Sequence, residues 1–125
     1  MTHILGLHAR LVVDDADEAL AFYAAAFDAE VSERHVIDGK VVHSIVTAGP
    51  VRFAVRDAGY GDAGPDGDST PVIMSLDVSD ADAVAERMLA AGATVVHPVS
   101  DHDYGDRGGR LRDPFGHQWT VSARR

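Results

Sequence analysis

The chain contains no cysteine, and aromatic residues make up only 6% of its 125 residues. Without cysteine there is no disulfide framework, no thiolate nucleophile and no thiolate ligand for a metal. Basic residues are scarce relative to acidic ones, because 11 Lys and Arg stand against 20 Asp and Glu, for a net charge of −9. A chain this acidic is not expected to bind nucleic acid or an anionic membrane surface.

Long apolar runs and nucleotide-binding motifs are missing as well. No stretch approaches the roughly 20 apolar residues of a membrane span, and no basic region followed by an apolar run indicates a signal peptide. We therefore expect a cytoplasmic protein. The sequence has no G-x-S-x-G motif, no P-loop and no G-x-G-x-x-G motif. Its 46% of hydrophobic residues suffices for the core of one domain.

What the chain does contain is an internal repeat with an offset of 65 residues. Residues 11–31 and 76–96 share the order of strand end, aspartate, helix and second strand. A repeat of fixed period indicates two copies of one supersecondary unit. Units of about 60 residues are marginal alone, so we expect one domain over residues 1–125. The identical pairs are Leu11/Leu76, Val13/Val78, Asp15/Asp80, Ala16/Ala81, Asp17/Asp82, Ala25/Ala90, Ala26/Ala91 and Val31/Val96.

Module one, about residues 3–57, is predicted to be a βαβββ unit. Alternating hydrophobicity predicts a strand over residues 3–13. Asp15 is expected to cap the following helix, with Glu18 three residues on, and Asp38-Gly39 indicates a tight hairpin. The remaining predicted strands cover residues 30–37, 40–47 and 51–56.

Module two, about residues 71–125, repeats this order after a Gly- and Asp-rich connector over residues 58–70. The connector leaves open whether the modules pair within one chain or exchange between two chains. Asp80 is expected to cap a helix over residues 81–91, which Gly92 ends. A polar loop is predicted over residues 100–109. The predicted strands cover residues 71–78, 94–99, 110–112 and 117–122.

One face of each predicted sheet is too polar for a dry core. Alternate residues of a strand share a face, and each helix must cover the opposite, apolar face. The fold class is therefore α+β, and two such sheets around a shared concavity would form a cleft, the usual site for a small molecule. The polar positions are His8, Arg10, His43, Thr47, Ser75, Asp77, Gln118 and Thr120.

The paired modules resemble the vicinal oxygen chelate superfamily, which includes glyoxalase I, extradiol dioxygenases, fosfomycin-resistance proteins and bleomycin-binding proteins. The first helix carries the pattern V-x-D-x-x-x-A-x-x-F-Y, and the C-terminal part reads Y-G-D-R over residues 104–107 and D-P-F-G-H-Q-W over residues 113–119. The latter runs look like the PhnB-like branch, with its W-G-D-R and D-P-F-G-H-x-W signature. The resemblance covers essentially the whole chain and implies a glyoxalase-like cleft, a small-molecule ligand and a homodimer.

The resemblance also implies where a metal would bind. Enzymes of the family hold a divalent metal through inward side chains of both modules, and the metal acts as a Lewis acid on the substrate. Carried over one at a time, the ligand positions fall on His8, Ile45, Ile73 and Thr120. Only His8 is a competent ligand, although a register slip of two would replace Ile45 by His43. We therefore expect no catalytic metal, with a bound divalent metal as the alternative.

The sequence thus favours a small-molecule-binding protein that binds or sequesters a metabolite or an antibiotic in its cleft. The alternative is a metal-dependent lyase, isomerase or dioxygenase of glyoxalase type that uses His8. A third reading is acid–base chemistry without metal, in which His8 or His43 acts beside Arg10. Whether the chain is an enzyme stays open at this point. The expected ligand-binding residues are His8, Arg10, His43, Ile45, Thr47, Ile73, Ser75, Tyr104, Gln118 and Thr120.

Several charged and aromatic side chains have a structural alternative. Arg10 is expected either to bind an anionic group of the ligand or to pair with Asp77 on the second module. Asp106 and Arg107 are expected to form an ion pair within their loop. Trp119 is expected to lie in the core, because it alternates with polar neighbours along its strand.

Overall fold

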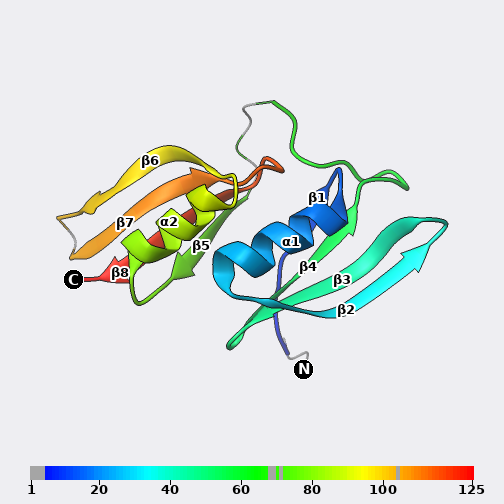
Figure 1. The fold of residues 1–125 in the computed structure, drawn as a ribbon, viewed down its shortest axis with the longest axis horizontal. Helices are drawn as coiled ribbons and strands as arrows, with labels where there is room; N and C mark the ends of the chain where they lie inside the picture. The colour runs from blue at the N-terminus through cyan, green and yellow to red at the C-terminus, as the bar shows by residue number, and fades with distance from the viewer. Residues whose placement is uncertain (1–4, 68–69, 71, 104) are drawn as a thin grey trace, which may run out of the picture.

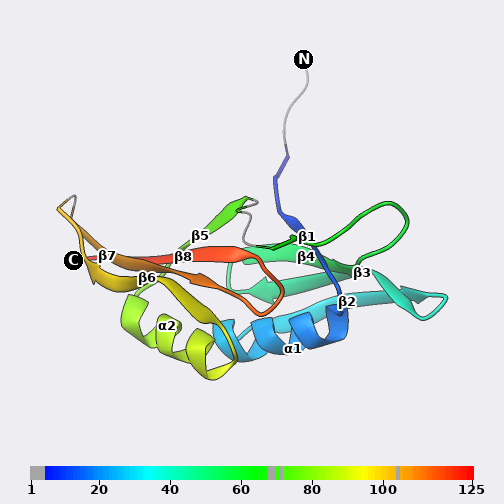
Figure 2. The ribbon, with the colours of Figure 1, turned by 90° about the horizontal axis from the view of Figure 1, so that it is seen from above.

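Two four-stranded sheets lie side by side in the computed structural model, and each carries one helix on the same side of the layer (Figures 1 and 2). The structure describes residues 5–67, 70, 72–103 and 105–125. The strand orders are β1-β4-β3-β2 and β5-β8-β7-β6, so the two modules repeat one topology. The fold is therefore α+β, built from two βαβββ modules, as the sequence predicts.

Module one begins with β1 (Arg10–Val13), which pairs in parallel with β4 (Val51–Asp57). Helix α1 (Ala16–Phe27) starts at Asp15, whose side chain accepts a hydrogen bond from the Glu18 backbone N–H at 3.1 Å. Strands β2 (Glu30–Ile37) and β3 (Lys40–Ala48) form a hairpin. Its turn residues Asp38 and Gly39 have φ values of 52° and 78°, the left-handed pair that a tight hairpin requires.

Module two uses the same devices. Helix α2 (Ala81–Ala90) starts at Asp80, whose side chain accepts a hydrogen bond from the Ala83 backbone N–H at 3.1 Å. Gly92, with φ of 117°, follows its end as predicted. The strands are β5 (Ile73–Asp77), β6 (Thr94–Asp101), β7 (Asp106–Arg112) and β8 (Gln118–Arg124).

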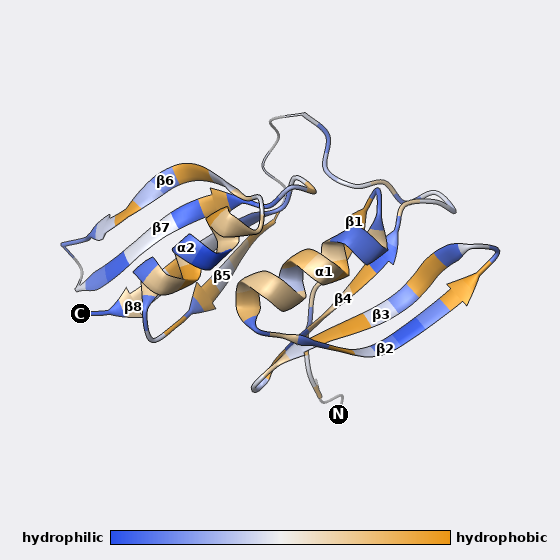
Figure 3. Ribbon diagram, viewed as in Figure 1, coloured by the Kyte–Doolittle hydropathy of each residue, from blue (hydrophilic) through white to orange (hydrophobic). Residues whose placement is uncertain are grey.

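Two predicted element boundaries are wrong. The predicted strand over residues 3–13 is strand only from Arg10, because residues 5–9 extend away from the sheet (Figure 2), with Leu5 98% and Leu7 97% exposed. The predicted polar loop over residues 100–109 is largely the β6–β7 hairpin. The pairing of β6 with β7 shifts between Val95 and His97 and again between His97 and Ser100. These irregularities, together with the polar residues and glycines of both strands (Figure 3), hide the alternating pattern of a regular strand.

The two modules pack against each other through their helices and an aromatic cluster. Helix α1 contacts α2, and the Trp119 ring of module two lies 5.6 Å from that of Tyr23, 5.1 Å from that of Phe27 and 5.4 Å from that of Phe53. Trp119 is only 1% exposed, which confirms its predicted core position. Within this chain the modules are therefore joined by side chains, since each sheet is complete in itself.

Asp113 is the buried polar centre of this junction. Its Oδ2 accepts hydrogen bonds from Tyr23 Oη at 2.7 Å and Trp119 Nε1 at 2.8 Å. Its Oδ1 accepts from the backbone N–H groups of Phe115 at 2.9 Å and His117 at 3.0 Å. Four donors compensate the burial of a carboxylate that is 3% exposed. The D-P-F-G-H run therefore has a structural role, because its aspartate binds side chains of both modules.

The described part of the connector is packed onto the molecule. A Cβ on Gly64 would lie 3.0 Å from the Val12 carbonyl oxygen, so this position needs glycine for its close approach to β1. The Arg112 Nη1 atom donates to the Gly67 carbonyl oxygen at 3.3 Å. These contacts place the connector against both modules. Among the residues described, no helix has the length and apolar character to cross a membrane.

Candidate functional site

A cleft of about 820 Å³ lies along the junction of the two sheets, between β1 and β5. We call it the seam cleft. β1 and β5 are the end strands of their sheets, and they pair only with β4 and β8. The gap between these two edges is floored by core side chains and closed at one side by the connector. The apolar lining includes Leu7, Leu11, Phe53, Val72, Met74, Leu76 and Trp119.

Five polar side chains line the seam cleft, and one of them, His117, has its Nε2 atom 3.0 Å from the Val12 carbonyl oxygen. His8, Arg10 and Ser75 are predicted ligand-binding residues, and the structure brings all three to this cleft. Arg52 joins them and was missed by sequence reasoning, which left the facing of its strand open. The register pairs Arg52 with Thr47 across β3 and β4. Thr47 was already assigned to the polar face, so the signal that could have placed Arg52 there is its position opposite Thr47 across the turn between the two strands.

On the open face of module one, Arg10 reaches across the sheet. Its Nη2 donates to the Val42 carbonyl oxygen at 2.6 Å, and its Nη1 lies 3.2 Å from His43 Nδ1. The His43 Nε2 atom lies 3.5 Å from Glu33 Oε1. Arg10 therefore bonds within module one, which corrects the alternative of a pair with Asp77.

The contacts of His43 limit what this ring can do chemically. A guanidinium donates only, so Nδ1 of His43 can join this hydrogen bond only as the acceptor, while Nε2 faces Glu33. Both ring nitrogens thus face protein partners. Arg10 starts on β1 and ends on β3, so its side chain crosses β4 at Ala54, with which it is in register. This crossing accounts for the burial of Ile45, which is 2% exposed and pairs with Ala54.

On the open face of module two, the predicted residues lie on neighbouring strands β5 and β8. Thr120 Oγ1 donates to Ser75 Oγ at 2.9 Å, and the two residues are in register. Ile73 is in register with Gln118. Gln118 is 2% exposed because the connector covers it, and its Nε2 donates to Thr70 Oγ1 at 3.3 Å.

The predicted site residues therefore form three groups. His8, Arg10 and Ser75 line the seam cleft, whereas the second group lies beside Arg10 on module one and the third lies beside Ser75 on module two. Tyr104 lies outside the described residues. The second group is His43, Ile45 and Thr47, and the third is Ile73, Gln118 and Thr120.

A second hollow, of about 680 Å³, lies on the open face of module two. We call it the module-two hollow. Gly108 and Gly109 form part of its floor, and Ser75 lines both this hollow and the seam cleft. Its charged and polar lining includes Ser75, Asp77, His97, Ser100, His102, Arg110, Thr120 and Ser122.

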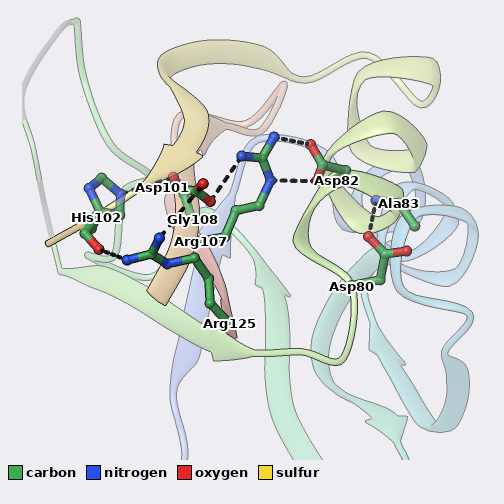
Figure 4. A network of polar contacts seen from close by, with 8 residues as sticks. All are labelled: Asp80, Asp82, Ala83, Asp101, His102, Arg107, Gly108 and Arg125. Carbon is green, nitrogen blue, oxygen red and sulfur yellow. Dashed lines mark hydrogen bonds and ion pairs between the residues drawn. The ribbon is translucent and has the colours of Figure 1, made fainter. Parts of the chain in front are cut away.

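The predicted ion pair between Asp106 and Arg107 is wrong, because Arg107 faces the helix (Figure 4). Its Nε donates to Asp82 Oδ2 at 2.7 Å and its Nη2 to Asp82 Oδ1 at 3.1 Å, while Nη1 donates to Asp101 Oδ1 at 3.2 Å. These bonds lower the pKa of Asp82 and raise that of Arg107. Arg107 thus ties the first turn of α2 to the β6–β7 hairpin, which is a structural role.

The comparisons with known proteins decide the family. Residues 5–121 match the model of the Glyoxalase/Bleomycin resistance protein/Dioxygenase superfamily. The chain belongs to this superfamily. It is 39% identical over 122 residues to uncharacterized proteins of Mycobacterium bovis and Mycobacterium tuberculosis, which covers 92% of this chain and 80% and 72% of those proteins.

Several solved structures share the fold of this superfamily member. TioX from Micromonospora sp. ML1 is 27% identical, with a TM-score of 0.75 over 96% of this chain and 100% of that one. A gene product from Arabidopsis thaliana is 25% identical, with a TM-score of 0.78 over 96% and 99%. A PhnB protein from Bacillus cereus, 18% identical with a TM-score of 0.72 over 94% and 98%, shares the fold alone.

The metal positions of the superfamily's enzymes do not fit a divalent ion in this member. Ile45 and Ile73 offer no donor atom, and the Thr120 hydroxyl hydrogen bonds to Ser75. His8 is a competent ligand but lies exposed on the extended segment before β1. Within the described ranges, no three His, Asp or Glu side chains gather as a metal site would need.

Proposed function

We propose that this superfamily member binds a compact small molecule in the seam cleft and does so without metal chemistry. The observation that carries the proposal is the make-up of the cleft. Ligand sites are typically concave, roughly 300–1,000 Å³ in volume and mostly apolar, with a few polar groups that fix orientation. The seam cleft has about 820 Å³, an apolar floor and a polar group of His8, Arg10, Arg52 and Ser75.

The lining also suggests the kind of ligand. An aliphatic or aromatic body would lie against Phe53 and Met74, and a carboxylate or another acceptor would face Arg10 and Arg52. We propose that a metabolite or an antibiotic of this kind is sequestered. Both ring nitrogens of His43 already face protein partners, and His8 is the histidine of the cleft whose replacement by alanine would test for conversion.

We propose further that two copies associate as a homodimer. Leu5 and Leu7 are 98% and 97% exposed on a segment that extends away from the sheets. Both sheet faces opposite the helices are uncovered apart from the connector (Figure 2). An extended apolar segment beside an open sheet edge favours association with a second copy.

The test of binding is a thermal-shift screen of metabolites and antibiotics, repeated with variants of the cleft wall. Ala63→Phe places a ring at the cleft wall, and Ala83→Phe adds the same ring to an exposed position of α2 outside the cleft. We expect ligands that stabilise the parent chain to stabilise Ala83→Phe equally and Ala63→Phe not at all. Ligands that act equally on both variants would contradict the seam cleft as the binding site.

The metal-dependent alternative has its own test. The chelator-stripped protein is titrated calorimetrically with Ni²⁺, Mn²⁺, Zn²⁺ and Fe²⁺, and the titrations are repeated with His8→Ala. We expect only the weak binding of scattered surface histidines in both proteins. Tight binding of one ion per protomer that is lost in His8→Ala would overturn the metal-free proposal. Such a result would favour a lyase, isomerase or dioxygenase of glyoxalase type.

A further inference from the structure

Arg110 in the module-two hollow has a buried donor without an acceptor. Its Nε atom is shielded from solvent and has no hydrogen-bond partner in the structure. Other arginines of the chain that are partly covered are satisfied, such as Arg56, which donates to Asp57 O, Gly59 O and Asp62 Oδ2. A buried donor without a partner is costly, and such groups call for an explanation.

The register places Arg110 at the centre of a polar row across the sheet. Arg110 pairs with Thr120 on β8 and with His97 on β6, and Thr120 pairs in turn with Ser75 on β5. Leu111, the next residue of β7, belongs to the core, so Arg110 points to the opposite, open face. The row therefore presents a guanidinium, an imidazole and two hydroxyl groups to the same hollow.

Gly108 lies two residues before Arg110 on β7 and also lines the hollow. A Cβ on Gly108 would lie 2.7 Å from the Val121 carbonyl oxygen, so this position needs glycine for the close approach of β7 and β8. The Nε and Nη atoms of a guanidinium form the edge that binds a carboxylate or a phosphate with two parallel hydrogen bonds. Arg110 lines the hollow, so an acceptor that enters it meets the guanidinium, and the two-bond edge is offered once the side chain turns its shielded Nε–H toward that acceptor.

We infer that the module-two hollow binds an oxyanion, a carboxylate or phosphate group of a small molecule, through Arg110. Ser75 and Thr120 add hydroxyl groups beside it, and His97 adds an imidazole ring. The site is distinct from the seam cleft, although Ser75 lines both. With a net charge of −9, the chain as a whole repels anions, so saturable anion binding would report a specific site.

Asp77 sets a limit on this site. It is the acidic residue of the hollow's lining, and it lies on β5, two strands away from Arg110 in the order β5-β8-β7. Its charge opposes an anion in the hollow. Removing that charge with Asp77→Asn is therefore expected to strengthen oxyanion binding, whereas a purely structural Arg110 would give no such gain.

The experiment follows the arginine Nε–H resonances by NMR while inorganic phosphate or acetate is added at constant ionic strength. We expect a saturable shift in the parent chain and in Arg87→Gln, which removes an exposed arginine of α2 outside the hollow. Arg110→Gln should weaken binding by at least about tenfold. Arg110→Lys keeps the charge but loses the bidentate edge, so it should weaken binding too.

The outcomes separate this inference from the seam cleft. Shifts that rise linearly without saturation, or binding that is equal in Arg110→Gln and Arg87→Gln, would overturn it. If Arg110→Gln fails to fold, Arg110→Lys and Asp77→Asn test the inference instead. Arg110→Lys should bind the oxyanion more weakly than the parent chain, and Asp77→Asn should bind it more tightly. Phosphate binding that persists in Ala63→Phe supports a separate site, and its loss there would overturn the assignment to this hollow.

Discussion

Tyr23 Oη donates a 2.7 Å hydrogen bond to Asp113 Oδ2, and this bond connects the first helix of module one to a turn of module two. Both side chains are buried, with Tyr23 at 0% and Asp113 at 3% exposure. No strand pairs across the described parts of the two sheets. The bond is therefore one of the side-chain contacts that fix the position of one module relative to the other. The walls of the seam cleft depend on that relative position.

Tyr23→Phe is expected to lower the free energy of unfolding by about 1–3 kcal/mol, because it removes one of four hydrogen bonds to a buried carboxylate. Urea unfolding of the two proteins measures the difference. Tyr60→Phe is the matched control, since Tyr60 is 68% exposed, and it should change the free energy by less than about 0.5 kcal/mol. Equal effects of the two substitutions would contradict the role of the Tyr23–Asp113 bond.

Stability should fall at alkaline pH because of the same tyrosine. Burial, and next the negative charge of Asp113, raise the pKa of Tyr23 well above 10. The unfolded chain then loses the tyrosine proton first, so the contribution is complete below about pH 10 and is lost as the pH rises above it. Urea unfolding between about pH 9 and 11 should show a decline of up to about 1.4 kcal/mol per pH unit. The decline should be shallower in Tyr23→Phe, and a parallel decline in both proteins would contradict this cause.

The Asp82–Arg107 pair predicts a small acid-side effect of the opposite sign. Hydrogen bonding to Arg107 lowers the pKa of Asp82 in the folded chain. Its contribution to stability is thus present above the unfolded value near 3.8 and is lost as the pH falls through the folded value. Asp82→Asn should therefore be less stable than the parent at neutral pH and equal to it at strongly acidic pH. High salt should shrink the difference, because the pair is exposed, and a difference unaffected by either pH or salt would contradict the ion pair as its cause.

Gly108→Ala is expected to destabilise the chain by about 1–3 kcal/mol through overpacking. A Cβ at this position would lie 2.7 Å from the Val121 carbonyl oxygen, and that backbone must shift to admit it. Gly6→Ala is the control, since a Cβ there meets no atom within 4 Å. Thermal unfolding of both variants gives the comparison. A Gly108→Ala variant as stable as Gly6→Ala would show that the backbones of β7 and β8 can move apart at little cost in free energy.

The proposed dimer makes a prediction for the extended segment. Leu7→Asp should shift the association equilibrium toward the monomer, because a charge replaces a side chain that is 97% exposed in the single chain and would be covered in the dimer. Sedimentation equilibrium over a range of protein concentrations measures the shift, with Leu89→Asp, on the exposed side of α2, as the control. A parent chain that stays monomeric throughout would contradict the proposal.

The local signals in the sequence predicted much of the fold. Asp15 and Asp80 both cap helices, and Asp38-Gly39 forms the predicted turn, because each depends on a few neighbouring residues. The strand over residues 3–13 was predicted too long. An alternating sequence shows that a segment can form a strand, but it does not show that a neighbouring strand is there to pair with it. β4 offers pairing only to Arg10–Val13 in the single chain.

The site was predicted less well, because it depends on long side chains and on contacts distant in sequence. Alternation placed Arg10 on the polar face, yet its partners are 32 and 33 residues away on β3. Arg107 was assigned to its neighbour Asp106, but it binds Asp82, 25 residues away, since the strand turns its side chain toward the helix. Periodicity gives the face of a side chain and says nothing of how far a guanidinium reaches.

The aspartates in the first turns of the two helices differ in the strand that supplies their arginine partner. Asp17 and Asp82 are equivalent in the repeat, and each is held by two hydrogen bonds from one arginine. Arg34 comes from the second strand of its module, whereas Arg107 comes from the third strand of the other. At the offset of 65, Val99 stands in place of Arg34 and Val42 in place of Arg107. If the halves descend from one duplicated ancestor, each of these two pairs of positions has changed since the duplication, and the equivalent aspartates are now held from two different strands.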